Sequence, residues 1–319
     1  MTTDLENDSS EGTETNSAVA FFIFRRPETT ARVFAEIRKA RPRKLYVIAD
    51  GARDGKPEEQ QLVQRTRDVV SEIDWPCEVT RVFAEQNLGL RQRIFTGLDH
   101  VFSKENSAII LEDNCLPSQS FFSFCSELLQ AHEKNENVAL VSGFNFAPSK
   151  LMQADYFYST STYIWGWATW ARTWKEFRTS PQVESWTTEE TEEIKGTFAS
   201  RIQMKEFLGM MSIADTLNTW DISLAVWVRQ SKKLTIVPRL NLVENIGFGA
   251  EATHTKFEAF DVQLPSSDYS AALIHPKVIA ADFKTERGMW RKKTSRWVTF
   301  PAKHPIRTIR SFVSYFKNR

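Results

Sequence analysis

Short apolar segments alternate with segments of helical character through the first 145 residues, and this alternation limits the folds open to the chain. The apolar segments have the length of buried strands, at 18–24, 44–49, 78–83, 107–111 and 138–142. The helical segments follow them, starting at Pro27 and spanning 57–73, 90–102 and 117–133. Strands without polar alternation are typical of parallel sheets covered by helices on both faces. The pattern therefore predicts an α/β fold, a three-layer sandwich around a mostly parallel sheet.

The second half of the chain lacks this regularity. It contains an extended segment at 156–162, a tryptophan-rich segment at 165–174, a polar helical segment within 181–200, a helix at 220–230, a strand at 234–238 and a loop at 242–255. The sequence shows no internal repeat, and we expect these helices and loops to belong to the same domain as the regular sheet.

Composition excludes several classes of protein. The 41 Lys and Arg residues nearly balance the 40 Asp and Glu residues, so binding to nucleic acid through bulk charge is not expected. The three cysteines form no CxxC pair, which excludes a disulfide scaffold or a structural zinc site and favours a reducing compartment. No apolar run reaches the 18 residues or so of a membrane span. We expect a cytoplasmic protein.

The two ends of the sequence carry opposite charge. Residues 1–17 hold five acidic residues and no Lys or Arg, which predicts a disordered acidic lead. Residues 284–319 hold eleven Lys and Arg residues against Glu286, interleaved with aromatic and aliphatic residues. This basic, aromatic tail suits the anionic inner face of a membrane; alternatively, its aromatic residues pack on the main domain.

Polar side chains follow several predicted strands, where open parallel sheets bind their ligands. Glu112, Asp113 and Asn114 come directly after the strand at 107–111. Neighbouring carboxylates repel each other, so a divalent cation or a hydroxyl-rich ligand would compensate them. The alternative is a turn whose acids cap the next helix.

Two further positions follow the first and second strands. Arg25 and Arg26 precede the helix that starts at Pro27, and a guanidinium binds phosphate through paired N–H groups. Asp50 precedes Gly51 and could accept a hydrogen bond from a base or a ribose. The alternatives are solvated arginines and an aspartate that initiates a turn.

Four segments in order resemble the nucleotide-binding half of GT-A-fold glycosyltransferases. They are AVAFFIFRRPETT, YVIADGARDG, AEQNLGLRQRIFTGLDHVF and IILEDNCLPSQSFFSF. The likeness is to bacterial nucleotide-diphospho-sugar transferases and, more distantly, to the N-acetylglucosaminyltransferase I group. It covers about residues 18–145 and continues thinly through the tryptophan cluster, Trp220-Asp221 and the loop at 245–255. The resemblance implies a GT-A-like sandwich with a nucleotide-sugar-binding half at 18–145 and an acceptor half at 146–283.

The resemblance also implies roles for individual residues. The donor, expected to be a UDP-sugar, would be bound by Arg25, Arg26, Asp50, Arg91, Glu112 and Asp113. Within this set, Arg26 would touch the diphosphate and Asp50 the uracil. Asn114 and His254 fall where the family binds Mn²⁺ or Mg²⁺, and Asp221 falls at the position of the catalytic base.

The implied chemistry is transfer of a sugar to an acceptor hydroxyl with inversion. Asp221 would take the hydroxyl proton while a cation or an arginine stabilises the leaving diphosphate. Tyr163, Trp165 and Trp167 would stack on the glycan or lipid-linked acceptor; the alternative for these aromatic residues is core packing. Asp221 has its own alternative as a helix N-cap, and His254 as a loop histidine without a ligand role.

Asn114 departs from the family pattern, which has an aspartate there. An amide oxygen ligates a hard cation but adds no charge, so the metal would be weakly bound or dispensable. A catalytically impaired nucleotide-sugar-binding partner protein is therefore the alternative function. A nucleotidyltransferase is less favoured, because residues 25–30 contain neither a glycine-rich loop nor a lysine.

Overall fold

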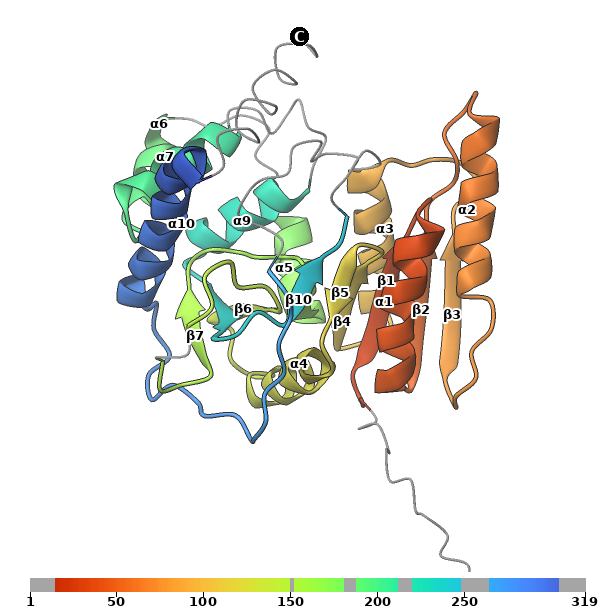
Figure 1. Ribbon diagram of the computed structural model, residues 1–319, viewed down its shortest axis with the longest axis horizontal. Coiled ribbons are helices and arrows are strands. Elements are labelled where there is room, and N and C mark those ends of the chain that lie inside the picture. Colours follow the sequence, from red (N-terminus) through yellow and green to blue (C-terminus); the bar gives the residue numbers. More distant parts are fainter. Residues whose placement is uncertain (1–14, 150–151, 181–187, 212–219, 248–263, 304–319) are drawn as a thin grey trace, which may run out of the picture.

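The computed structural model describes residues 15–149, 152–180, 188–211, 220–247 and 264–303, without the side chains of 188–191 and 295–303. These residues build a mixed α/β fold around an eight-stranded sheet of order β3-β2-β1-β4-β8-β6-β9-β7 (Figure 1). The strands are β1 (Ala18–Ile23), β2 (Lys44–Ala49), β3 (Glu78–Phe83), β4 (Ser107–Glu112), β6 (Val138–Ser142), β7 (Tyr156–Ser159), β8 (Trp167–Trp170) and β9 (Leu234–Pro238). A second, two-stranded sheet pairs β5 (Cys115–Pro117) with β10 (Val243–Asn245).

Most pairs in the large sheet are parallel. Strands β3, β2, β1 and β4 run parallel to one another, and β6 runs parallel to β9. Strand β8 is inserted antiparallel between β4 and β6, and β7 pairs antiparallel with β9. The antiparallel β8 thus joins the two parallel parts of the sheet.

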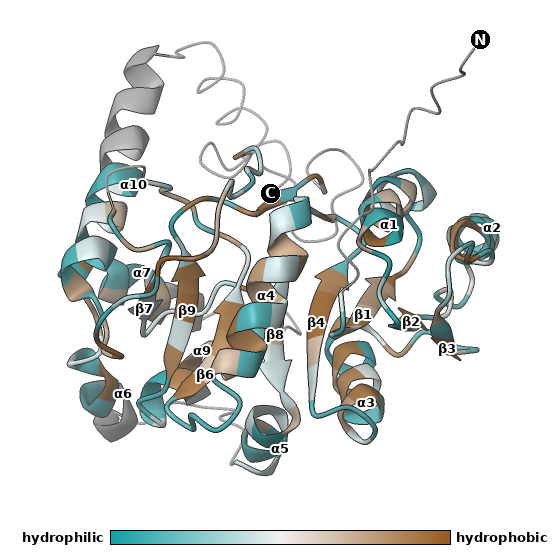
Figure 2. Ribbon diagram, turned by 90° about the horizontal axis from the view of Figure 1, so that it is seen from below, coloured by the Kyte–Doolittle hydropathy of each residue, from teal (hydrophilic) through white to brown (hydrophobic). Residues whose placement is uncertain are grey.

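Helices cover both faces of the sheet, as Figure 2 shows with α1 and α2 on one side and α3 and α5 on the other. The helices are α1 (Pro27–Ala40), α2 (Pro57–Val69), α3 (Leu90–Phe102), α4 (Gln119–Ala131), α5 (Ala171–Thr179), α6 (Thr188–Lys195), α7 (Arg201–Met211), α9 (Asp221–Gln230) and α10 (Phe283–Lys303). Helix α1 begins at a proline, which needs no hydrogen-bond acceptor there. It buries Val33, Phe34 and Ile37 at helical spacing.

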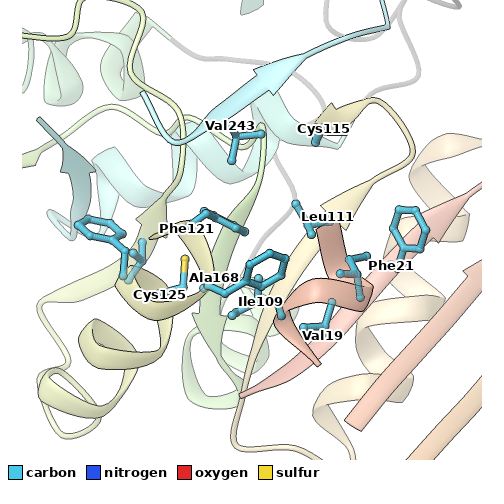
Figure 3. Close-up of a cluster of buried hydrophobic side chains, with 14 of the residues drawn as sticks. Val19, Phe21, Ile109, Leu111, Cys115, Phe121, Cys125, Ala168 and Val243 are labelled. Atoms are coloured by element: carbon cyan, nitrogen blue, oxygen red, sulfur yellow. The ribbon is translucent and has the colours of Figure 1, made fainter. Parts of the chain in front are cut away.

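The core on the α1 side is a continuous cluster of apolar side chains (Figure 3). Val19 and Phe21 of β1 and Ile109 and Leu111 of β4 are fully buried there, and Phe121 of α4 packs into the same cluster. Complete burial of each large side chain contributes about 1.5–3 kcal/mol. This core holds the carboxyl ends of β1 and β4 in place.

The predicted α/β fold with a mostly parallel sheet is confirmed. Strands β2, β3, β6 and β9 and helix α3 lie at the predicted residues. The sequence pattern missed β5, β8 and β10, which are only three or four residues long. Strand β8 lies within the tryptophan-rich segment and β10 within the predicted loop.

The ends of the chain required correction. Residues 1–14 of the lead predicted at 1–17 lie outside the described residues, but Thr15 is buried, and its N–H donates to the Ala40 carbonyl at 3.2 Å. The first residues of the tail predicted at 284–319 also pack into the domain. Glu286 is fully buried, and Met289 and Trp290 pack in a core cluster. Within the described part of the chain, none of the helices has the length and apolar character needed to cross a bilayer.

Candidate functional site

Two charged segments meet at the carboxyl ends of β1 and β4. The two strands are parallel neighbours with Phe22 opposite Glu112, so the residues that follow them emerge side by side. The Phe24 N–H donates to Asp113 Oδ2 at 3.2 Å, and Arg26 Nη1 lies 3.7 Å from Asp113 Oδ1. The sequence prediction that Arg26 and Asp113 share one site agrees with this geometry.

Arg25 points toward another acid. Its Nη1 lies 3.4 Å from Oε2 of Glu59 on α2, and Glu59 also binds the Arg53 guanidinium and accepts from the Arg53 N–H at 2.9 Å. These partners lower the pKa of Glu59 to about 2 despite its burial, and Arg53 makes the largest contribution. Arg25 still acts electrostatically on Asp113, so it lies at the border of the acidic cluster.

The acidic cluster contains uncompensated negative charge. Burial raises the pKa of Glu112 to about 7, and the charges of Asp113 and Asp221 raise it further, against the lowering effect of Arg26. Burial also raises the pKa of Asp113 to about 6, although Arg26, the Phe24 N–H and Arg25 oppose it. A carboxyl cluster that resists ionisation is typical of a functional site, because a bound cation or a substrate can supply the missing compensation.

Asp221 reaches this cluster from the other half of the chain. It is the first residue of α9, directly after Trp220. The Trp220 ring stacks on Trp167 of β8, with centroids 5.6 Å apart, and both rings are buried. This stacking fixes the start of α9 close enough to the end of β4 for Asp221 to influence Glu112. Trp220 occupies the N-cap position of α9 and Asp221 is the first helical residue, so Asp221 is not the N-cap of this helix.

Asn114 is held by the segment that follows β10. Its Nδ2 donates to Asn245 Oδ1 at 3.3 Å, and its carbonyl accepts from the Ile246 N–H at 2.8 Å. Asn245 Oδ1 also accepts from the Gly247 N–H at 2.9 Å. A Cβ at Gly247 would lie 2.7 Å from Asn114 Cβ and 3.1 Å from Arg26 Nη1, so glycine is required for this close approach. Sequence reasoning missed Asn245 and Gly247 because they lay in a segment predicted to be a loop.

The acids after β4 do not cap α4. The Ser120 N–H in the first turn of α4 donates instead to Asp268 Oδ1 at 2.8 Å. Asp113 accepts instead from the N–H of Phe24, the residue that follows β1. The capping interpretation of the Glu112-Asp113-Asn114 segment is therefore wrong.

The same segment has oxygen donors suited to a hard cation. Carboxylate oxygens of Glu112 and Asp113 and the amide oxygen of Asn114 are the ligand types that Mn²⁺ and Mg²⁺ prefer. The described part of the chain contains no group of three His, Cys, Asp or Glu residues that could hold a metal. Predicted ligand His254 lies outside the described residues. The segment therefore offers oxygen donors of the type that a hard cation prefers, but the described residues do not assemble them into a complete metal site.

Asp50 has a different role from the one predicted. Its Oδ1 accepts from the N–H groups of Gly51 and Leu88, each at 2.9 Å, and its Oδ2 accepts from Asn87 Nδ2 and the Gly89 N–H, each at 3.1 Å. These four donors use the acceptor capacity of the carboxylate. Asp50 therefore fixes the 87–89 part of the loop and keeps no acceptor site for a base.

Arg91 lies in the first turn of α3. Its guanidinium is 5.5 Å from the centre of the Phe95 ring, a cation–π arrangement. Among the described residues it forms no ion pair with the acidic cluster, so its predicted contact with the donor stays a prediction.

The three predicted acceptor-binding aromatic residues differ in exposure. Trp167 is 1% exposed in the sheet core, so its predicted stacking on an acceptor is wrong. Trp165 is half-buried, with its ring centre 4.4 Å from that of Phe144. Tyr163 is also half-buried and packs edge-on against Phe146. Tyr163 and Trp165 retain partly exposed surfaces for an acceptor.

Comparison with known proteins finds similarity of fold only. No family model matches the sequence, and no curated protein matches it. Among solved structures, 4-diphosphocytidyl-2C-methyl-D-erythritol synthase from Anaerococcus prevotii aligns over 60% of this chain and 84% of its own, with 9% identity and a TM-score of 0.32.

Two structures of UDP-glucose pyrophosphorylase are also similar. The apo form aligns over 72% of this chain and 93% of its own, with 9% identity and a TM-score of 0.34. The form complexed with UDP-glucose aligns over 50% of this chain and 71% of its own, with 9% identity and a TM-score of 0.25. Scores this low carry no argument about activity, which is inferred below from the site.

Proposed function

We propose that the protein is an inverting glycosyltransferase that moves a sugar from a nucleoside-diphosphate donor, a UDP-sugar, to an acceptor hydroxyl. The observation that carries the proposal is the electrostatic effect of Asp221 on Glu112, next to the Arg26–Asp113 pair. This arrangement supplies a carboxylate and a guanidinium, contributed by different parts of the chain, at the carboxyl ends of parallel strands. A base on one side and positive charge on the other is what glycosyl transfer needs.

Arg26 is the residue proposed to bind the donor diphosphate, and Arg25 lies at the border of the same site. The charge balance of the site also favours a divalent cation. Glu112, Asp113 and Asp221 outnumber the two arginines, and a diphosphate adds further negative charge. Asp113 and Asn114 would hold the cation, and a bound Mn²⁺ or Mg²⁺ would neutralise charge on the leaving diphosphate.

Asp221 is proposed to act on the acceptor. Its carboxylate takes the hydroxyl proton as the acceptor oxygen forms a bond to the anomeric carbon. The bond between that carbon and the diphosphate oxygen breaks, and its electron pair leaves with the nucleoside diphosphate. Arg26 stabilises the negative charge that collects there. Tyr163 and Trp165 offer apolar faces for the acceptor sugar.

Binding of UDP, measured by thermal shift with and without Mn²⁺, tests the donor site. A ligand at a hundredfold excess over Kd stabilises the native state by about 2.7 kcal/mol. We expect UDP to raise the Tm of the native protein, and the Arg26→Met variant to lose most of this rise. The matched control is Arg32→Met, which removes an exposed arginine of α1, the helix that Arg26 precedes. If UDP, GDP and TDP all leave the Tm unchanged, the nucleotide-sugar proposal is wrong.

A second candidate is a nucleotide-sugar-binding protein without transferase activity. It is favoured by Asn114, whose amide already donates to Asn245 and brings no charge to a metal. Such a protein would bind UDP as above but would neither hydrolyse nor transfer the sugar of any nucleotide-sugar donor. A turnover assay over a panel of UDP-sugars separates the two functions.

The acceptor is proposed to be a glycan or a lipid-linked sugar at the inner face of a membrane. The basic composition of residues beyond 294 supports this part of the proposal, although their side chains lie outside the described set. Binding to phosphatidylserine vesicles, but not to phosphatidylcholine vesicles, would support it, and the binding should weaken with salt. Equal binding to both vesicle types would contradict it.

A further inference from the structure

A groove lies between the edge strand β3 and helix α3. It encloses about 480 Å³ and is open to solvent on one side. Val82 of β3 and the 84–88 loop form one wall, and Arg93, Thr96 and His100 of α3 form the other. None of these residues belongs to the acidic cluster at the ends of β1 and β4, and the proposed transfer reaction does not use them.

Arg93 is the unusual residue in this groove. It is only 6% exposed, yet its Nε and Nη2 atoms are buried and find no hydrogen-bond partner among the residues that the structure describes. Among the described residues it also forms no salt bridge, although Glu85 lines the same groove. A buried guanidinium without a partner is unfavourable, so native proteins pair such groups with an anion.

The acid with the clearest electrostatic effect on Arg93 is already occupied. Asp50 favours the charged form of Arg93, while burial lowers the Arg93 pKa. The oxygens of Asp50 accept hydrogen bonds from the 87–89 segment and from Gly51, as described above. Asp50 therefore holds the wall of the groove and does not bond to Arg93.

His100 supplies a second unsatisfied group on the same helix face. It follows Arg93 by seven residues, two turns of helix, and its Nε2 is buried without a partner. Its ring packs against Tyr46, with ring centres 6.3 Å apart. Thr96 lies between the two and donates its hydroxyl to the Gln92 carbonyl at 2.9 Å, so its proton is used within α3.

The wall opposite α3 is held rigidly. Arg67 of α2 donates to the Ala84 carbonyl at 2.8 Å and to the Asp50 carbonyl at 3.1 Å. The close approach of Gly51 to Gln86 also fixes the loop, because a Cβ at Gly51 would lie 2.5 Å from the Gln86 carbonyl carbon. The groove is thus preorganised, so a ligand would not have to order the loop.

We propose that this groove binds an oxyanion, a phosphate or carboxylate group of a small ligand, through Arg93 and His100. A planar guanidinium binds either group with paired hydrogen bonds, and a neutral imidazole with its proton on Nε2 adds a further donor. The site would be separate from the diphosphate site at Arg26.

Thermal shift and isothermal titration with inorganic phosphate and with acetate, at constant ionic strength, test the proposal. We expect at least one of the two anions to bind saturably and raise the Tm of the native protein. The Arg93→Met variant should lose this rise and, in anion-free buffer, have a Tm equal to or above that of the native protein. Arg65→Met removes an arginine that is 61% exposed and should respond as the native protein does.

A histidine NMR titration of the native protein gives a readout that does not depend on a variant. The His100 ring resonances should shift with the same saturation curve as the thermal response. An equal Tm rise in Arg93→Met, no response to either anion, or an unmoved His100 signal would overturn the proposal. If Arg93→Met also loses the response to UDP, the groove belongs to the donor site and the separate site is wrong.

Discussion

The molecule contains two buried polar clusters that differ in charge balance. In the first, Arg229 of α9 donates to Ser161 Oγ at 2.7 Å, and Ser161 donates to Glu286 Oε1 at 2.6 Å. Gln203 of α7 donates to the same Glu286 oxygen at 2.5 Å. One positive and one negative side chain are therefore bridged by neutral groups, and this network attaches α10 to the domain.

The second cluster contains more negative than positive side chains. Asp113 and Asp221 both raise the pKa of Glu112 while Arg26 lowers it, and Arg26 and Arg25 lower the pKa of Asp113. Balanced charge in the first cluster is typical of a structural network, and unbalanced charge in the second is typical of a site that awaits a ligand. Residues of the first cluster hold the fold, whereas residues of the second are the ones proposed to act on a substrate.

The largest expected effect is on stability and comes from the balanced cluster. Glu286→Gln keeps the side-chain shape but leaves the Arg229 charge buried without its counterion, which costs about 3–5 kcal/mol. Urea unfolding of the variant should show this loss. Glu206→Gln is the matched control, because it breaks a partly exposed pair with Lys293 on the same helices and should cost under about 1 kcal/mol. Equal losses in the two variants would contradict the structural role of Glu286.

The next effect is on turnover and comes from the unbalanced cluster. Asp221→Asn removes the proposed base and should lower turnover by about 100-fold or more while UDP binding is kept. Steady-state assays with the preferred UDP-sugar measure this. Asp74→Asn removes an exposed carboxylate paired with Arg38 and should leave turnover unchanged. Native-like rates in Asp221→Asn would remove Asp221 from the mechanism.

The third effect is a pH dependence of stability. Because the native state raises the pKa of Glu112 from 4.5 to about 7, it binds more protons than the unfolded state between these values. The stability contributed by protonated Glu112 is therefore present at low pH and is lost as the pH rises through about 7. At about pH 8, the Glu112→Gln variant should have a free energy of unfolding about 1–3 kcal/mol higher than that of the native protein. Below neutrality, its stability should change less with pH than that of the native protein. Urea unfolding across pH measures this, and an unchanged pH profile would show that Glu112 is ionised normally.

The smallest effect concerns the metal. Asn114→Asp adds a charged oxygen beside Asp113 and should tighten Mn²⁺ binding by roughly tenfold, about 1.4 kcal/mol, in the presence of UDP. Calorimetric titration measures the affinity, with Asn135→Asp as a control that adds the same charge away from the cluster. A weakened metal-dependent enzyme would also gain turnover, whereas a binding protein would gain affinity alone. Unchanged affinity would mean that residue 114 does not face the metal.

The sequence predicted those parts of the fold that depend on local pattern. Buried strands such as β2 and β9 were found because uninterrupted apolar runs of that length have few alternatives. Strand β8 was missed because its order in the sheet depends on partners far away in sequence, Ala168 pairing with both Ile109 and Val141. Long-range pairing of a four-residue segment leaves no local signal.

Those parts of the site that follow directly from the order of the strands were predicted as well. Arg26 and Asp113 could be placed together because both follow parallel strands of the predicted sheet. The burial of Trp167 and the occupied oxygens of Asp50 could not be predicted, since both depend on how distant loops and helices close over the sheet. The approach of Gly247 to Asn114 could not be predicted either, because the two residues lie far apart in the sequence.

The antiparallel insertion of β8 also determines how the chain must be assembled. Strands β1 to β4 can pair as soon as they are synthesised, but β4 and β6 have no partner on their facing edges until residues 167–170 arrive. Until then both edges expose unpaired backbone groups flanked by apolar side chains, which are templates for aggregation. A fragment ending near residue 145 would therefore be an insoluble product, and expression trials that aim to isolate the first half should extend at least through β8.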